Sequence, residues 1–335
     1  MIRVGIVGAT GYTALELIKI LLRHPQVQVT CVTSRENLGE SIEKTHPSLR
    51  GLLDVRFEPF DASRIAQKTD FVFCCLPHGA SAESVMALRQ QGLKVVDFSA
   101  DYRLSSLDVY TEWYGIEHPD QETFGSVPYG MPEFFGEQIA QAELVANPGC
   151  FPTSAILPLA PLVAENLIDP SDLIVDSKSG VTGAGRKPNL AFHFPEANES
   201  FKAYKVASHR HQPEMDDILE RATGVITGCL FTPHLVPMDR GILSTIYGTN
   251  LQNKSESELL DAIQAKYQGC PFIRVTPELP TTKDVYGTNY CDITVRTNRD
   301  KIILISVLDN LGKGASGAAV QNFNLMNGFE ETTAL

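Results

Sequence analysis

The sequence lacks the features that mark several classes of protein. Its 335 residues hold no apolar run of membrane-spanning length, and no charged leader precedes the first apolar run at residues 4–7. Its seven cysteines are an odd number without metal-ligand spacing. We therefore expect a cytoplasmic protein with reduced thiols, no metal site and no membrane association. A net charge of −12 also disfavours general nucleic-acid binding, although a local basic pocket could hold phosphates.

Repeats, low-complexity segments and long linkers are also absent from the sequence. The chain exceeds the length at which a single hydrophobic core usually stops growing, so two domains are expected. The hydrophobic share of 43% is ample for real cores.

The first glycine-rich turn lacks the third glycine of the strict dinucleotide-binding fingerprint. The apolar run at 4–7 predicts a buried parallel strand, and apolar residues from position 15 onward have helical spacing. Glycines between them would let the backbone approach a pyrophosphate, and the helix N-terminus would supply amide donors. A tight turn without a ligand is the alternative. The predicted cofactor-binding loop comprises Gly8, Ala9, Thr10, Gly11, Tyr12 and Thr13, with Ala14 as the small residue that packs helix on strand.

The second predicted strand, at 27–32, lacks the terminal acidic residue that would hold the ribose 2′-hydroxyl of NAD. Ser34 and Arg35 instead offer a hydroxyl and a guanidinium, which suit the 2′-phosphate of NADP. The sequence therefore favours NADP, although Glu36 lies close by and Arg35 could be a solvated loop residue.

Strand patterns at 70–76 and 94–98 alternate with a helix pattern at 80–90, which predicts an α/β fold with a parallel, doubly wound sheet. Turns at the carboxyl ends of these strands, at Pro77 and at Ser99, should line the cofactor crevice. His78 is expected to be a turn or surface residue.

A candidate nucleophile lies near the middle of the chain. Residues 144–146 end a strand pattern, Pro148 and Gly149 favour a turn, and Pro152 suits the first turn of a helix. Cys150 would then lie at a helix N-terminus, where free amides and the helix dipole stabilise a thiolate and could hold an oxyanion. The alternative is an inert buried cysteine. A position at a helix start is not enough for a nucleophile, which also needs a partner base and a substrate.

Two further segments carry polar side chains with a possible chemical use. A strand pattern at 173–179 opens into a glycine-rich loop that ends in Arg186 and Lys187, which is either an anion-binding backbone or a flexible surface loop. Within residues 204–214 a strand is predicted to lead into a helix at 215–222, and His209 and His211 lie near this junction. They are either structural residues or acid–base catalysts, and no third ligand accompanies them to suggest a metal.

The rest of the second half predicts a mixed or largely antiparallel sheet with helices on one face. One helix, at 255–267, begins with the capping-box pair Ser255 and Glu258. A last helix opens at 309–317 and is predicted to run through Phe329. We expect it to pack back on the first domain, which would make that domain discontinuous.

Several motifs together resemble one family: NPGCFPT around Cys150, HRHQPE around His209, the GATGYT loop, and DNLGKGASG near the C-terminus. The sequence is similar to the N-acetyl-gamma-glutamyl-phosphate reductases of arginine biosynthesis. These oxidoreductases lie within the wider aspartate-semialdehyde dehydrogenase and glyceraldehyde-phosphate dehydrogenase superfamily. The similarity runs essentially from end to end, and the cysteine and histidine motifs are its specific part. Ala14 and Ser154 depart from the family pattern, but both are small.

The resemblance implies a Rossmann dinucleotide-binding domain at residues 1–148 and 312–335. It implies an α+β mixed-sheet catalytic domain of the glyceraldehyde-phosphate dehydrogenase-like type at 149–311. The implied protein is a cytoplasmic homo-oligomer, a dimer or tetramer, that uses NADPH to reduce an acyl phosphate to a semialdehyde through a cysteine thioester. Cys150 becomes the nucleophile and His209 the acid–base residue. The other implicated residues are Asn310, Lys313 and Gly314 beside the nicotinamide, and Arg103, Ser179, Gly180, Arg186, His211 and Glu214 around the substrate.

Two alternative functions stay open from the sequence. The same chemistry could act on aspartyl phosphate or carrier-linked aminoadipyl phosphate, because pocket selectivity can depend on a few contacts. A non-catalytic NADP-binding sensor would keep the glycine loop but would leave the cysteine and histidine motifs unexplained.

Overall fold

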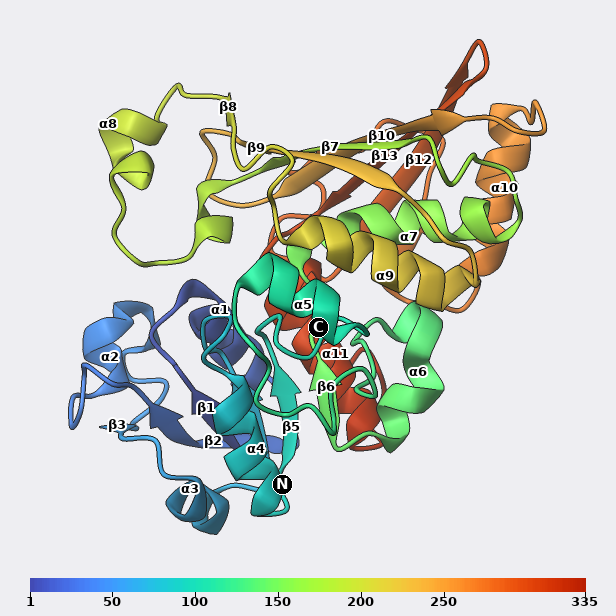
Figure 1. The fold of residues 1–335 in the computed structure, drawn as a ribbon. Helices are drawn as coiled ribbons and strands as arrows, with labels where there is room; N and C mark the ends of the chain where they lie inside the picture. Colours follow the sequence, from blue (N-terminus) through green and yellow to red (C-terminus); the bar gives the residue numbers. More distant parts are fainter. The chain divides into compact units, whose positions relative to one another are not determined.

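The computed structural model describes all 335 residues, which divide into two compact units. Unit 1 comprises Met1–Pro148 with Ala315–Leu335, and unit 2 comprises Gly149–Gly314. Each unit is built on its own β-sheet with its own helices (Figure 1). None of the helices is both long and apolar enough to cross a membrane.

Unit 1 contains a six-stranded parallel sheet in the order β3-β2-β1-β4-β5-β6. Its central strands are β1 (Ile2–Val7), which is buried over residues 4–7, and β4 (Phe71–Cys74), which is apolar and fully buried. The strand order reverses between β1 and β4, where doubly wound sheets bind nucleotides beyond the carboxyl ends of the strands. The other elements up to residue 148 are α1 (Tyr12–Leu21), β2 (Val27–Thr33), α2 (Ile42–Thr45), a 3₁₀ turn (Pro47–Leu49), β3 (Phe57–Glu58), α3 (Ala62–Lys68), α4 (Ala82–Gln90), β5 (Lys94–Asp97), α5 (Leu107–Tyr114), α6 (Pro132–Gln141) and β6 (Leu144–Ala146).

The last helix, α11 (Gly317–Met326), belongs to unit 1 and packs on α1, α6 and β5. Its Phe323 ring meets the ring of Phe71 edge-on, with the centroids 4.7 Å apart. Its Asn322 donates a hydrogen bond of 2.9 Å to the carbonyl of Gly130. The helix ends at Met326 rather than continuing through Phe329 as the sequence predicted.

Unit 2 contains a seven-stranded mixed sheet in the order β11-β12-β13-β10-β7-β9-β8. Its β7–β9 and β11–β12 pairs are parallel and the other pairs are antiparallel. Burial alternates along β7, β9 and β10, because α7, α9 and α10 cover one face of the sheet (Figure 1). The elements are α7 (Cys150–Ala164), β7 (Leu173–Ser179), 3₁₀ turns (Val181–Ala184 and Leu190–Phe192), α8 (Phe194–Ala197), β8 (Lys202–Ala203), α9 (His211–Thr223), β9 (Cys229–Leu235), β10 (Ile242–Thr249), α10 (Glu256–Lys266), β11 (Ile273–Val275), β12 (Cys291–Asn298) and β13 (Lys301–Leu308). A π-helical turn (Gly312–Ser316) follows β13.

The buried helix α7 is continuous although it contains Pro158 and Pro161. A proline inside a helix removes the amide that would bond the carbonyl four residues earlier, here the carbonyls of Ser154 and Leu157. Both carbonyls find another donor in unit 2. The Ser306 hydroxyl donates to the Ser154 carbonyl at 2.7 Å, and the Tyr267 hydroxyl donates to the Leu157 carbonyl. These contacts also fasten α7 to β13 and to the end of α10.

The strand predicted to lead from Tyr204 into the helix at 215–222 is not formed. Lys205 and Ala207 have φ angles of 46° and 55°, in the left-handed region that strands do not use, and the backbone forms turns there. A turn therefore delivers His209, and α9 begins at His211, earlier than predicted. The capping box is confirmed, because the Ser255 hydroxyl accepts from the Glu258 amide and the Glu258 carboxylate accepts from the Ser255 amide.

Candidate active site

Cys150 is the first residue of α7, and the extended backbone of Gly149 forms the N-cap. Cys150 forms no disulfide and is partly exposed. A helix N-terminus presents unpaired amides and the positive end of the helix dipole, and both favour the thiolate form of a cysteine. A β-carbon added to Gly314 would lie 3.0 Å from the β-carbon of Cys150, so the Gly314 backbone packs directly against the nucleophile candidate.

His209 lies in a group of aromatic rings beside the start of α7. Its Nδ1 accepts a hydrogen bond of 3.1 Å from the backbone amide of His211, at the first residue of α9. The neutral imidazole must therefore carry its hydrogen on Nε2, which makes Nε2 its hydrogen-bond donor. The ring centroids around His209 lie at 4.7 Å for His211, 5.3 Å for Phe231, and 5.7 Å for both Phe151 and Tyr204.

Tyr204 belongs to this ring cluster, and its phenol is also affected by the charge of Cys150. Burial, followed by the nearby charge of Cys150, raises the pKa of the Tyr204 phenol. The phenol consequently stays protonated and can act as a hydrogen-bond donor. The sequence had given Tyr204 no role. No local sequence pattern marks Tyr204, because its contacts with the ring cluster form only in the folded chain.

Glu214 lies in the first turn of α9, and its side chain is 1% exposed. Its Oε1 accepts a hydrogen bond of 2.9 Å from the backbone amide of Gly149. The predicted pocket residue thus holds the residue immediately before Cys150.

The glycine-rich loop after β7 begins with two buried residues, Ser179 and Gly180. A β-carbon on Gly180 would lie 2.6 Å from the Asp239 carbonyl oxygen, so only glycine fits there. Arg186, farther along the loop, is exposed. The loop therefore begins with buried, closely packed residues and ends with an exposed cation, Arg186.

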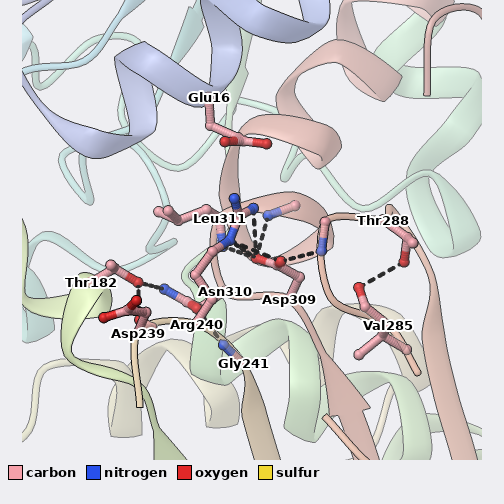
Figure 2. Close-up of polar contacts among 12 residues, drawn as sticks. Glu16, Thr182, Asp239, Arg240, Gly241, Val285, Thr288, Asp309, Asn310 and Leu311 are labelled. Atoms are coloured by element: carbon pink, nitrogen blue, oxygen red, sulfur yellow. Dashed lines mark hydrogen bonds and ion pairs between the residues drawn. The ribbon is translucent and has the colours of Figure 1, made fainter. Parts of the chain in front are cut away.

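Asn310 ties this loop to the residues that follow β13 (Figure 2). Its Oδ1 accepts from the Gly241 amide at 2.7 Å, and its Nδ2 donates to the Thr182 hydroxyl at 3.0 Å. Lys313 is buried, with its ammonium 5.7 Å from the centroid of the Phe272 ring. Both residues therefore have fixed side chains in unit 2.

In unit 1 the predicted phosphate-binding loop has the geometry that a dinucleotide requires. Gly8 has a φ of 82°, and a β-carbon there would lie 2.7 Å from the Cys75 carbonyl oxygen. At Gly11 a β-carbon would meet only the Thr13 hydroxyl, at 3.9 Å, so the space above this backbone is open. Gly11 is the N-cap of α1 and no side chain caps the helix, which leaves its first amides facing that space. These residues fit a pyrophosphate, with Ala9, Thr10, Tyr12 and Thr13 completing the loop.

Two residues behind the loop hold it in place. The Gly8 amide donates to the Thr33 hydroxyl at 3.2 Å. The Nε2 of His46, a residue 3% exposed, donates to the Ala9 carbonyl at 2.9 Å. Sequence reasoning missed His46, because it contacts a loop far away in the chain and no local pattern marks it.

The remaining predicted residues of unit 1 differ in exposure. The Ser34 hydroxyl accepts from the amide of Asn37 at 3.3 Å, and Arg35 and Pro77 are exposed. Ser99 is fully buried and donates to the Asp97 carboxylate at 2.5 Å. Arg103 is also buried and donates hydrogen bonds to the carbonyls of Asn147 (2.8 Å) and Phe98 (2.7 Å). It therefore holds the backbone of unit 1, whereas the sequence predicted only a contact with the substrate.

No group of three or more histidine, cysteine, aspartate or glutamate side chains in the structure could hold a metal ion.

Each of the two units corresponds to a known family of domains. Residues 3–142 match the model of the semialdehyde dehydrogenase NAD binding domain, and residues 150–310 match the semialdehyde dehydrogenase dimerisation domain. An aspartate semialdehyde dehydrogenase II from Vibrio cholerae has a similar structure, with a TM-score of 0.74 over 98% of both chains. Its 18% sequence identity limits this likeness to the fold. The fold and the matched models define the class as a semialdehyde dehydrogenase, which confirms the predicted fold class.

Relatives with much higher identity narrow the class to one family. An N-acetyl-gamma-glutamyl-phosphate reductase from Rhodopirellula baltica is 51% identical over 100% of this chain and 98% of that relative. One from Magnetococcus marinus is 49% identical over 100% of this chain and 97% of the relative. The chain belongs to the N-acetyl-gamma-glutamyl-phosphate reductase family, as its motifs predicted.

Proposed function

We propose that the chain reduces N-acetyl-gamma-glutamyl phosphate with NADPH to N-acetylglutamate 5-semialdehyde and phosphate, a step of arginine biosynthesis. The observation that carries this proposal is the position of Cys150 at the N-terminus of α7, beside the ring cluster that contains His209. Membership of the family supports this substrate, and the position of Cys150 supports its role as the nucleophile.

In the first half of the reaction, the Cys150 thiolate attacks the acyl carbon. The bond from that carbon to the phosphate oxygen breaks, phosphate leaves, and a thioester forms on Cys150. The amides at the start of α7 are placed to stabilise the negative charge on the carbonyl oxygen, and one such donor is typically worth about 10²–10³-fold in rate. Glu214 keeps this helix start in place through the Gly149 amide.

NADPH, when bound, supplies the hydride that reduces the thioester carbon. His209, which takes up the thiol proton when the Cys150 thiolate forms, then gives a proton to the developing oxyanion; a thiohemiacetal results and the imidazole becomes neutral. When the carbon–sulfur bond breaks, the hydroxyl proton returns to His209, the thiolate is restored, and the semialdehyde leaves. His209 thus ends the cycle as it began.

Residues 1–148 with 312–335 would bind the cofactor, and residues 149–311 would carry the chemistry. Gly8, Ala9, Thr10, Gly11, Tyr12 and Thr13 would hold the pyrophosphate. Ser34 and Arg35 would hold the 2′-phosphate, while Pro77, Ser99, Asn310, Lys313 and Gly314 would border the rest of the dinucleotide. The open space at Gly11 and the uncapped start of α1 support the first assignment.

For the substrate, Arg186 is the exposed cation that suits a phosphate or carboxylate. Arg103, Ser179, Gly180, His211 and Glu214 would shape the rest of the pocket. Ser179 and Gly180 are buried at the start of the Arg186 loop, which supports a fixed anion-facing backbone.

The protein would act as a cytoplasmic homo-oligomer, a dimer or tetramer, without binding nucleic acid. The face of the unit 2 sheet opposite α7 carries a row of apolar side chains in register: Leu230 is 57% exposed, Ile174 40% and Tyr247 36%. Exposed apolar rows of this kind mark interfaces, and the matched model for residues 150–310 is a dimerisation domain. The net charge of −12 opposes nucleic-acid binding.

A substrate panel tests the proposal. Phosphate-dependent reduction of NADP would be measured with N-acetylglutamate semialdehyde, aspartate semialdehyde and aminoadipate semialdehyde, each also with NAD. We expect the highest kcat/KM for N-acetylglutamate semialdehyde with NADP. A preference for either other aldehyde would contradict the substrate, and absence of any turnover would favour a non-catalytic NADP-binding protein.

A further inference from the structure

Asp309 directly follows β13, and its carboxylate is fully buried. Its Oδ1 accepts from Nε and Nη2 of Arg240 at 3.1 and 3.0 Å, and its Oδ2 accepts from the Gly287 amide at 2.6 Å (Figure 2). The amides of Leu311 and Gly312 donate to Oδ1 at 2.8 and 3.1 Å. One carboxylate therefore joins the segment before β10, the segment before β12 and the turn after β13.

The guanidinium of Arg240 balances the charge of this carboxylate. Burying a carboxylate is costly unless it is paired and hydrogen-bonded, and an arginine fork can satisfy two acceptor positions at once. Arg240 also lies over the ring of Tyr286, 5.3 Å from its centroid. Removing either partner would leave the other as an uncompensated charge in the interior.

The turn that Asp309 holds reaches Cys150. The Asp309 carbonyl accepts from the Gly314 amide at 2.9 Å, and Gly314 packs on the β-carbon of Cys150. The next residue, Asn310, bridges the Gly241 amide and the Thr182 hydroxyl. A shift of this turn would therefore move both the surface against the cysteine and the side chain that fixes the glycine-rich loop.

We infer that Asp309 and Arg240 are positioning residues, and that their ion pair fixes residues 309–314 against Cys150. Neither residue acts on the substrate itself. Their effect is on geometry, and a displacement of about 1 Å at a reacting group can cost about 10²-fold in rate. The kinetic part of the test rests on the proposed function, whereas the thiol-labelling part does not.

The test uses Asp309→Asn, Arg240→Met and Arg240→Lys in the full chain. Asparagine is isosteric but places an NH₂ donor towards the Arg240 or Gly287 donors. We expect kcat to fall about 10²-fold in Asp309→Asn and Arg240→Met while KM for NADPH changes little. Lysine keeps the charge but not the fork, so Arg240→Lys should lie between these variants and the wild type.

The matched control is Asp292→Asn. Asp292 is another nearly buried carboxylate of unit 2 that is paired with an arginine, Arg274, at 2.6 and 2.7 Å, and that arginine also lies over a tyrosine ring. Its side chain hydrogen-bonds to Arg274 and not to residues 309–314, so Asp292→Asn should lose thermal stability without losing kcat. Thermal unfolding would be recorded for every variant, so that Arg240→Lys carries the test if Asp309→Asn does not fold.

Labelling of Cys150 by iodoacetamide without substrate gives the second readout. We expect a labelling rate that differs from the wild type in Asp309→Asn and Arg240→Met and is unchanged in Asp292→Asn. The labelling rate does not depend on the proposed substrate, so it would still report the position of the Cys150 thiol if the protein acted on another acyl phosphate. Equal labelling and equal kcat in Asp309→Asn and Asp292→Asn would overturn the inference.

Discussion

The Oε1 atom of Glu214 accepts a 2.9 Å hydrogen bond from the backbone amide of Gly149, the residue that precedes Cys150. The two residues lie far apart in the chain, yet the bond joins the N-termini of α7 and α9. The nucleophile candidate and the turn that carries His209 are therefore positioned by a shared contact.

Glu214→Ala should leave the Gly149 amide buried without this acceptor, which costs about 1–3 kcal/mol of unfolding free energy. It should also lower kcat, because the start of α7 is no longer held. Glu214→Gln keeps an acceptor oxygen and should cost much less in both measurements. Denaturant unfolding and steady-state kinetics of the pair check this, and equal behaviour of the two variants would argue against the positioning role.

His209→Asn keeps an acceptor close to the position of Nδ1 for the His211 amide, but it removes the hydrogen on Nε2. We expect an unfolding midpoint near that of the wild type, together with a kcat that is lower by about 10²–10⁴-fold, the usual contribution of a general acid–base. The pH–rate profile should also lose the limb that belongs to the imidazole. Wild-type turnover or an unchanged profile in this variant would remove His209 from the mechanism.

His46→Ala should raise KM for NADPH, because the Ala9 carbonyl loses its buried donor and the glycine loop is no longer fixed. At saturating NADPH, kcat should change little. His24→Ala is a matched control, since His24 is another buried histidine of unit 1 and pairs with Asn324 at 3.1 Å. A similar rise in KM for both variants would point to a general loss of packing instead.

Burial raises the pKa of Asp97 from 3.8 to about 6, against the opposing effect of hydrogen bonds from Ser81 and Ser99. A carboxyl whose pKa is higher in the folded state stabilises the fold fully below about pH 4, and this contribution is lost as the pH rises through about 6. Asp97→Asn removes that dependence. The variant's unfolding free energy relative to the wild type should therefore rise from pH 4 to pH 7, and a constant difference would refute the assignment.

Local patterns were sufficient to predict much of the fold. The buried runs of β1 and β4 and the capping box of α10 are each determined by neighbouring residues, so their sequence signals match the structure. The turn chemistry at Pro148 and Gly149 likewise placed Cys150 at a helix start.

Contacts between distant residues could not be predicted in this way. The prolines of α7 would normally interrupt a helix, and only the hydroxyls of Ser306 and Tyr267 show why this one continues. The strand expected before His209 does not form, because Lys205 and Ala207 take positive φ angles that their residue types do not signal. The Arg240–Asp309 pair likewise depends on three segments that meet only in the folded chain.

The most direct measurement of the central claim is the mass of the protein after it is mixed with N-acetyl-gamma-glutamyl phosphate in the absence of NADPH. We expect one acyl group on the peptide that contains Cys150, removable by hydroxylamine, and released phosphate in equal amount. Cys150→Ala should show no adduct and no reduction while still binding NADPH. An adduct on another residue, or reduction by the Cys150→Ala variant, would contradict the account.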